Sequence, residues 1–139
     1  MAHRCLVWEP VSGITSPCAD ISYSYEAPAH LTVRMNFSRT TGGPGRDLKM
    51  VFTGPIALAW APEHYGALDS IEGELPKCPD PRWSKWTFPL LKVMDSQWLK
   101  RHVDHHPGAA GCVHFYLVGM NDLVSVLALP EVQAQWTQT

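Results

Sequence analysis

The chain has 139 residues, of which 45% are hydrophobic and 17% charged, and its formal net charge at pH 7 is -2. Disordered chains combine low hydrophobicity with a high net charge, so this composition predicts a folded chain with a single domain over residues 1–139. Phosphate backbones attract clustered Lys and Arg, and the slightly acidic balance therefore argues against nucleic acid as a partner.

The amino-terminal residues contain one short apolar stretch, which Glu9 and Pro10 interrupt. This stretch is shorter than the apolar core of a secretory signal, and no apolar run approaches the ~20 residues of a membrane-spanning helix. We therefore expect a cytoplasmic protein without a membrane partner. Wide spacing predicts free thiols, some of them buried, at Cys5, Cys18, Cys78 and Cys112.

Alternating apolar and polar residues predict two β-strands in the first third of the chain. Residues 21–26, ISYSYE, and residues 30–39, HLTVRMNFSR, both have the period of two that places alternate side chains on one face. The Ala-Pro-Ala between them is a break, so we expect antiparallel neighbours. The buried face of the second strand is expected to carry Leu31, Val33, Met35 and Phe37.

Residues 48–60, LKMVFTGPIALAW, predict two further β segments that Gly54 and Pro55 divide. Proline cannot donate a ladder hydrogen bond, so Pro55 is expected at an edge or a kink. The first segment is expected to place Leu48, Met50 and Phe52 on one face, and the second segment resumes this pattern with Ile56, Leu58 and Trp60.

Residues 61–86 have four prolines and no periodicity, which predicts a long loop of the kind that often carries function. The sequence RWSKW could stack on bases, but without a wider basic field it is more typical of a protein interface or of tryptophans that close over the core. The candidate binding residues are Tyr65, Arg82, Trp83 and Trp86, with an acidic rim at Asp69, Glu72 and Glu74.

The last third predicts a short helix followed by a β-hairpin and a final strand. Asp95 or Ser96 is expected to cap a helix that ends in basic residues near His102, as the helix dipole favours. Residues 113–118 and 123–128 flank a Gly-Met-Asn-Asp turn, and residues 132–136 alternate again. Together these patterns predict an α+β, strand-rich fold with a twisted antiparallel sheet and one or two short helices. The residues expected to face the core of the hairpin are Val113, Phe115 and Leu117, with Leu123 or Val124 opposite.

The histidine-rich segment after residue 101 raises an alternative, because His102, His106, Cys112 and His114 have the side chains of a tetrahedral zinc site. Their spacing matches no recognised metal signature, and the neighbours His105 and His106 point apart on any regular backbone. A Cys112 nucleophile with a nearby histidine base is a second possibility, but no orienting Asn or Asp stands in a recognisable context. We expect no catalytic residue, metal or cofactor, with a small metal-dependent or cysteine hydrolase in the His102–His114 region as the alternative.

The order of three segments resembles a pattern found in small bacterial proteins of unassigned function. The chain has Phe-x-Gly-x-x-Ala, a Ser-x-Trp-Leu turn, and a His-Phe strand paired with one that ends in Val-x-Ala, over residues 48–136. Some bacterial proteins of this kind act as immunity proteins or interaction partners. The resemblance therefore implies a non-enzymatic protein-binding module. Its expected partner is another protein or a second copy of the same chain. The residues that carry it are Phe52, Gly54, Ala57, Ser96, Trp98, Leu99, His114, Phe115, Val126 and Ala128.

Overall fold

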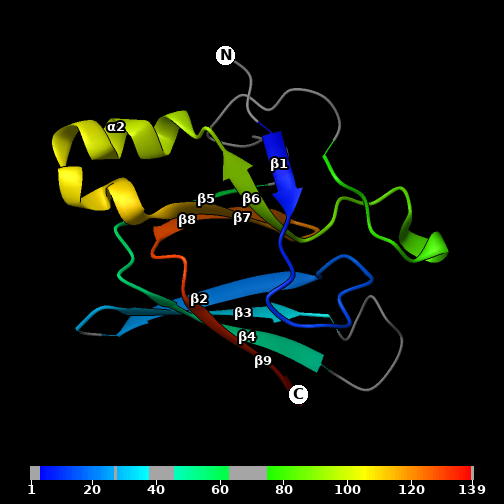
Figure 1. Cartoon of the computed structure of the whole chain (residues 1–139). Helices are drawn as coiled ribbons and strands as arrows, with labels where there is room; N and C mark the ends of the chain where they lie inside the picture. The colour runs from blue at the N-terminus through cyan, green and yellow to red at the C-terminus, as the bar shows by residue number, and fades with distance from the viewer. Residues whose placement is uncertain (1–3, 27, 38–45, 63–74, 139) are drawn as a thin grey trace.

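The structure is a computed structural model that describes residues 4–26, 28–37, 46–62 and 75–138. These residues form two antiparallel β-sheets that lie face to face (Figure 1). The larger sheet has the strand order β1 (Arg4–Val7), β6 (Leu90–Met94), β7 (Val113–Val118), β8 (Asp122–Ala128), β5 (Ala57–Pro62). The smaller sheet has the strand order β2 (Asp20–Glu26), β3 (His30–Asn36), β4 (Arg46–Thr53), β9 (Val132–Gln138).

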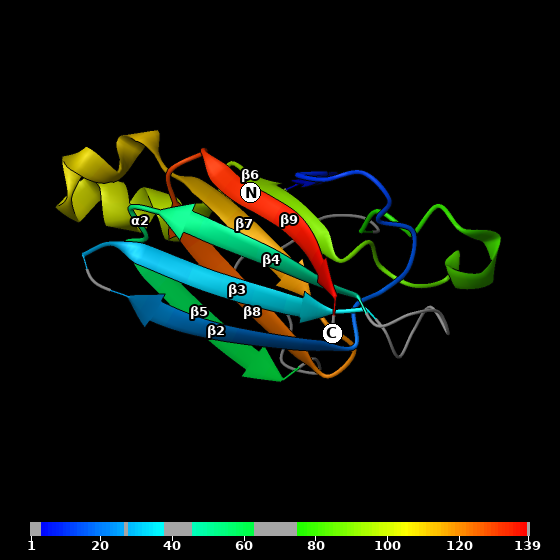
Figure 2. The same ribbon diagram turned by 90° about the horizontal axis from the view of Figure 1, so that it is seen from below.

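The helical segments are short and follow or precede strands of the larger sheet. They are η2 (Pro81–Trp83), α2 (Gln97–His105) and η3 (Pro107–Gly111). Figure 2 shows the four-stranded sheet from below, with no described helix over its outer face. The strand-rich α+β class with short helices is therefore confirmed, and the strands are divided between two sheets rather than gathered in one.

Both predicted hairpins are present. β2 pairs with β3 so that Ser24 lies opposite Thr32, and β7 pairs with β8 so that Leu117 lies opposite Val124. Phe115 and Leu117 are fully buried, while Val113 is partly buried against the same core. The prediction that these residues face the core with Val124 opposite is confirmed.

The dipeptide Gly54-Pro55 marks the point where the chain leaves one sheet for the other. Gly54 has a φ of 59°, which is the left-handed region, and β5 then pairs with β8 instead of continuing beside β3. Glycine adopts this backbone without the steric penalty that a Cβ atom brings. The predicted division into two β segments with a kink is confirmed.

The core lies between the sheets and receives aromatic side chains from both. Phe52 of β4 and Phe115 of β7 have ring centroids 5.1 Å apart, and Trp8, just after β1, lies 4.5 Å from Phe115 and 6.1 Å from Phe52. Such edge-to-face and tilted contacts are favourable for aromatic rings. This cluster fixes the two sheets against each other and so positions the edges described below.

Candidate functional site

The predicted tryptophan loop is only partly within the described residues. Tyr65, Asp69, Glu72 and Glu74 lie outside them, whereas the two tryptophans, Trp83 and Trp86, do come together, with ring centroids 6.3 Å apart in an edge-to-face contact. The side chain of Asp80 caps η2, and its Oδ2 atom lies 2.9 Å from Nη2 of Arg82. The guanidinium of Arg82 holds the pKa of the Asp80 carboxyl below its ordinary value. Arg82 is therefore committed to an ion pair within this loop, and Trp86 is exposed beside it.

The histidines of the hypothetical metal site have separate surroundings. His114 is buried on β7, and its Nδ1 atom lies 2.7 Å from the hydroxyl of Ser96. His102 lies on α2 and contacts the edge of Trp98, which also contacts His114, with centroid distances of 5.7 and 5.1 Å. Among the residues that the structure describes, no group of three or more His, Cys, Asp or Glu side chains could hold a metal ion.

Ser96 gives the buried His114 a polar contact and so suggests a structural role for this histidine. Its side chain accepts a hydrogen bond from the backbone N–H of Leu99 at 3.1 Å, which makes Ser96 the residue that caps α2. Asp95, the other predicted cap, has a φ of 58° in the turn between β6 and the helix. Since the hydroxyl of Ser96 is close to both the helix amide and the imidazole, it joins the start of α2 to β7.

Cys112 lines a cleft between α2 and the five-stranded sheet. Ser96 and His114 line the same cleft. Burial raises the pKa of the Cys112 thiol above its ordinary value. A nucleophilic cysteine requires the thiolate, which a cationic or basic neighbour normally stabilises. The environment of Cys112 favours the neutral thiol, as in a structural cysteine.

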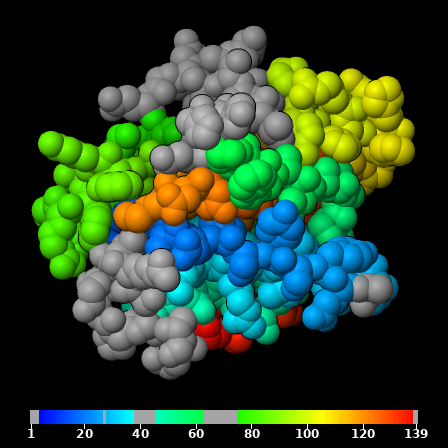
Figure 3. All heavy atoms as spheres, turned by 180° about the vertical axis from the view of Figure 1, so that it is seen from behind, coloured from blue at the N-terminus to red at the C-terminus, as the bar shows by residue number. Residues whose placement is uncertain are grey.

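A different site lies along one side of the sandwich, where the edge strands β2 and β5 run next to each other. In Figure 3, β5 in green lies directly above β2 in blue. Four large apolar side chains are exposed here: Tyr23 is 47% exposed, Tyr25 61%, Ile56 43% and Trp60 53%. Scattered apolar side chains are ordinary on protein surfaces, but a gathered set is typical of a binding surface.

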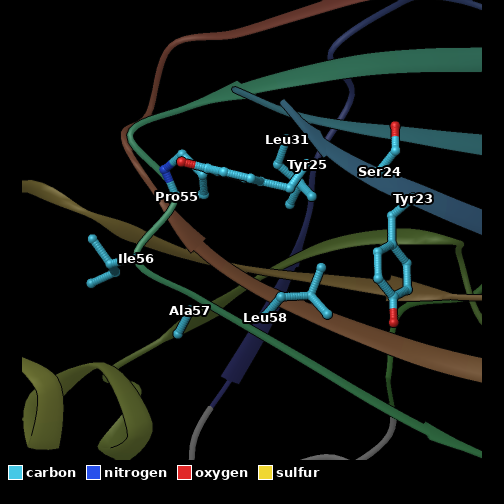
Figure 4. A pocket seen from close by; sticks show the side chains of 8 residues that line it. All are labelled: Tyr23, Ser24, Tyr25, Leu31, Pro55, Ile56, Ala57 and Leu58. Atoms are coloured by element: carbon cyan, nitrogen blue, oxygen red, sulfur yellow. The ribbon is translucent and has the colours of Figure 1, made fainter. Parts of the chain in front are cut away.

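Between these strands is an apolar groove with a volume of about 380 Å³, which we call the β2/β5 groove. Figure 4 shows Tyr23 projecting from β2 toward Leu58, while Tyr25 extends toward Pro55 at the other end. The Tyr25 hydroxyl donates a hydrogen bond to the carbonyl oxygen of Pro28 at 3.1 Å. The lining residues are Tyr23, Ser24, Tyr25, Leu31, Pro55, Ile56, Ala57 and Leu58.

Strand alternation explains how the groove forms. Leu58 packs against the core from β5, so Trp60, two residues further along the strand, faces the same way, and Ile56 lies just before the strand. Ile21 packs against the core from β2, so Tyr23 and Tyr25 also face inward. Because both strands are sheet edges among the described strands, no further described strand covers these inward side chains, and they remain exposed.

None of the described residues that line the groove is charged, but the carboxyl group of Asp122 lies near Trp60 of β5. The indole N–H of Trp60 donates a hydrogen bond to Oδ2 of Asp122 at 3.2 Å. Burial raises the pKa of Asp122, and the charge of Asp20 at the start of β2 raises it further. Two carboxyl groups, those of Asp122 and Asp20, therefore lie near each other beside Trp60.

Sequence reasoning missed the groove because the two edge strands are brought together only by the tertiary fold. The alternation places Ile56, Leu58 and Trp60 on one face of a strand and Tyr23 and Tyr25 on one face of another, but it does not indicate that the two faces meet. The only available signal was the polar and small composition around Tyr23 and Tyr25, which is typical of an edge strand.

Comparisons of the chain with protein-family models, with curated proteins and with solved structures find no match. The resemblance to small bacterial proteins thus gains no support from these comparisons. Within the described ranges, no helix is long and apolar enough to cross a membrane. The function is therefore inferred from the geometry of the chain itself.

Proposed function

We propose that this chain is a non-enzymatic protein-binding module and that the β2/β5 groove is the surface that contacts its partner. The observation that carries this proposal is the gathering of Tyr23, Tyr25, Ile56 and Trp60, all exposed, along one side of the sandwich. Tyrosine and tryptophan are enriched at the centres of protein interfaces because they combine large apolar area with a polar group.

The form of the groove also suits a protein partner. It is open along its length and bounded by two edge strands, whose outward backbone groups can pair with an added strand. The four cysteines are free thiols, which suits the reducing environment of a cytoplasm. We accordingly place the interaction in the cytoplasm.

The alternative function is a small hydrolase in the His102–His114 region. The cleft that holds Ser96, Cys112 and His114 favours it only through the residue types present. Ser96 and His114 are buried and bonded to each other, and burial raises the pKa of Cys112. These features suggest that Ser96, His114 and Cys112 stabilise the fold. A binding module is therefore better supported than a hydrolase.

Affinity capture followed by titration tests the proposed function. The wild type is compared with a Tyr25→Ser, Trp60→Ser double variant. The matched control is a Trp83→Ser, Trp86→Ser double variant, which also replaces two aromatic side chains with serine. Partners captured by the wild type are purified and titrated calorimetrically. We expect the groove variant to lose at least about tenfold in affinity, since exposed aromatic anchors dominate interface energies.

The tryptophan-loop control should retain its affinity within about twofold, because neither Trp83 nor Trp86 lines the groove. Circular dichroism confirms that each variant is folded. Equal binding by the groove variant would contradict the assignment of the surface. Turnover of a small molecule that disappears in Cys112→Ala would contradict the non-enzymatic function itself.

A further inference from the structure

β2 is an exposed edge strand of seven residues. It pairs with β3 on one side, no other described strand pairs with its second side, and all its residues except Ile21 are exposed. Natural sheets usually protect such an edge with a proline, a bulge, a lysine or a covering segment, because its N–H and C=O groups can pair with another strand. Residues 20–26 contain no proline or lysine, so the outer edge of β2 is suited to strand addition.

The two faces of β2 would meet an added strand differently. Tyr23 and Tyr25 face the β2/β5 groove. Ser24 borders this groove, but its hydroxyl points to the outer surface of the sheet, on the same side as Glu26 (Figure 4). Side chains of an added strand also alternate between the two faces. Every second residue of such a strand would therefore enter the groove and contact apolar atoms such as those of Leu58.

Both ends of β2 carry a carboxylate, and Arg34 of β3 and Lys49 of β4 lie on the same outer face as Glu26. Asp20 and Glu26 are its first and last residues, and β3 places Asn36 and His30 opposite them. Within the described part of the chain, neither carboxylate forms an ion pair. An added strand with cations near both ends would complement this pattern, because opposite charges directly across a sheet are stabilising.

The same charges disfavour a second copy of this chain as the occupant. Antiparallel pairing of two β2 strands over their full length would place Tyr23 opposite Tyr23 and Asp20 opposite Glu26, at both ends. Like charges directly opposite each other destabilise a strand pair. The partner strand is therefore expected to come from a different protein.

Resting on the protein-binding function proposed above, we infer that β2 binds an extended segment of another protein by strand addition. This segment carries apolar side chains at alternate positions, which fill the groove, and Lys or Arg near both ends, which face Asp20 and Glu26. Backbone hydrogen bonds supply affinity in this binding mode, and the side chains supply specificity.

Two sets of capped synthetic peptides test this inference. One set has the pattern Lys-Φ-Thr-Φ-Thr-Φ-Lys and the other Glu-Φ-Thr-Φ-Thr-Φ-Glu, where Φ is Val, Ile, Leu or Tyr. Fluorescence anisotropy with the full chain at low salt measures the affinities. We expect the Lys-ended peptides to bind about fivefold to tenfold more tightly, and we expect salt to reduce this preference.

A charge-reversal variant makes the test specific. In the Asp20→Lys, Glu26→Lys double variant the preference should invert, so that Glu-ended peptides bind more tightly. The matched control is Asp104→Lys, Glu131→Lys, which makes the same change of net charge at exposed positions of α2 and of the turn before β9. This control should keep the preference of the wild type. Amide hydrogen exchange should show that the bound peptide protects β2.

Four outcomes would overturn the inference. If peptides bind equally well with either end charge, the inferred contacts of Lys or Arg with Asp20 and Glu26 are wrong, but the proposed function is unaffected. Binding that leaves the β2 amides unprotected would exclude strand addition. A dimer in sedimentation that Tyr23→Lys dissociates would make a second copy the occupant. Failure of every peptide in both sets would reject this binding mode, while affinity capture would still decide the proposed function separately.

Discussion

Phe115 lies where the two sheets meet, and its ring contacts both Trp8 and Phe52. These three side chains come from distant parts of the chain, yet each is fully or nearly fully buried. Truncating a buried aromatic ring removes its burial energy and leaves a cavity that the neighbours fill only in part. At the scale of single residues, this cluster is therefore where substitution should destabilise the fold most.

We expect Phe115→Ala to reduce the free energy of unfolding by about 3–5 kcal/mol. Urea denaturation monitored by circular dichroism measures this loss. Gln133→Ala, at an exposed position of β9, is the control and should change stability by less than about 0.5 kcal/mol. A loss below about 1 kcal/mol for Phe115→Ala would mean that the ring is not a core residue and that the register of β7 is wrong.

Ser96 has two structural roles, as the cap of α2 and as the hydrogen-bond partner of His114. We expect Ser96→Ala to cost roughly 2–4 kcal/mol, because it removes a helix cap and a hydrogen bond to a buried imidazole. Asp80→Ala removes the cap of η2 without disturbing a buried hydrogen bond, so it should cost less stability than Ser96→Ala. Equal losses in the two variants, measured by urea denaturation, would show that the contact with His114 contributes nothing.

The buried thiols predict a loss of stability at alkaline pH. Burial raises the pKa of Cys78 from 9.0 to about 11, and burial also raises the pKa of Cys18. Above pH 9 the unfolded chain releases these protons while the folded chain retains them, so stability falls as the pH rises toward 11. We expect a Cys18→Ala, Cys78→Ala double variant to lose less stability than the wild type between about pH 8 and pH 10.5. Parallel losses in urea titrations would contradict this assignment.

At the scale of secondary structure, elements formed by neighbouring segments were predictable from the sequence. The β2–β3 and β7–β8 hairpins follow from alternation around a break, and α2 follows from its capping residue. The pairings of β1 with β6, β4 with β9 and β5 with β8 were not predicted, since a period of two does not identify a distant partner. For the same reason the β2/β5 groove was not predicted, because its two strands are distant in the sequence.

Gly54 is an element boundary where a substitution should be costly. A Cβ atom at Gly54 would lie 3.1 Å from Cδ1 of Leu129, and its φ of 59° is unfavourable for other residues. We expect Gly54→Ala to destabilise the protein by about 1–3 kcal/mol in thermal or urea denaturation. Gly111→Ala, where nothing lies within 4 Å, is the matched control and should be close to neutral or stabilising. A neutral Gly54→Ala would show that the crossing between sheets tolerates other backbone conformations.

At the scale of the whole molecule, one core joins the two sheets while one side of the sandwich stays open. Trp136 of β9 lies on the smaller sheet, where its indole N–H donates a hydrogen bond to the carbonyl oxygen of Ser12 at 2.8 Å. The guanidinium of Arg46 lies 3.8 Å above the same ring. These contacts hold the segment after β1 against the smaller sheet, whereas no comparable contact among the described residues closes the groove between β2 and β5.

The shared core predicts that the two sheets unfold together, as the single-domain hypothesis requires. Trp8 and Phe115 belong to the side of the larger sheet and Phe52 to the smaller one, so neither sheet keeps its buried face without the other. We expect tryptophan fluorescence, near-ultraviolet and far-ultraviolet circular dichroism to report one coincident urea transition. Phe52→Ala and Phe115→Ala each alter one sheet. In each variant, the midpoints of all three signals should shift together to the same lower urea concentration. Separate transitions, or a variant that shifts only one signal, would show two independently stable units and contradict the single domain.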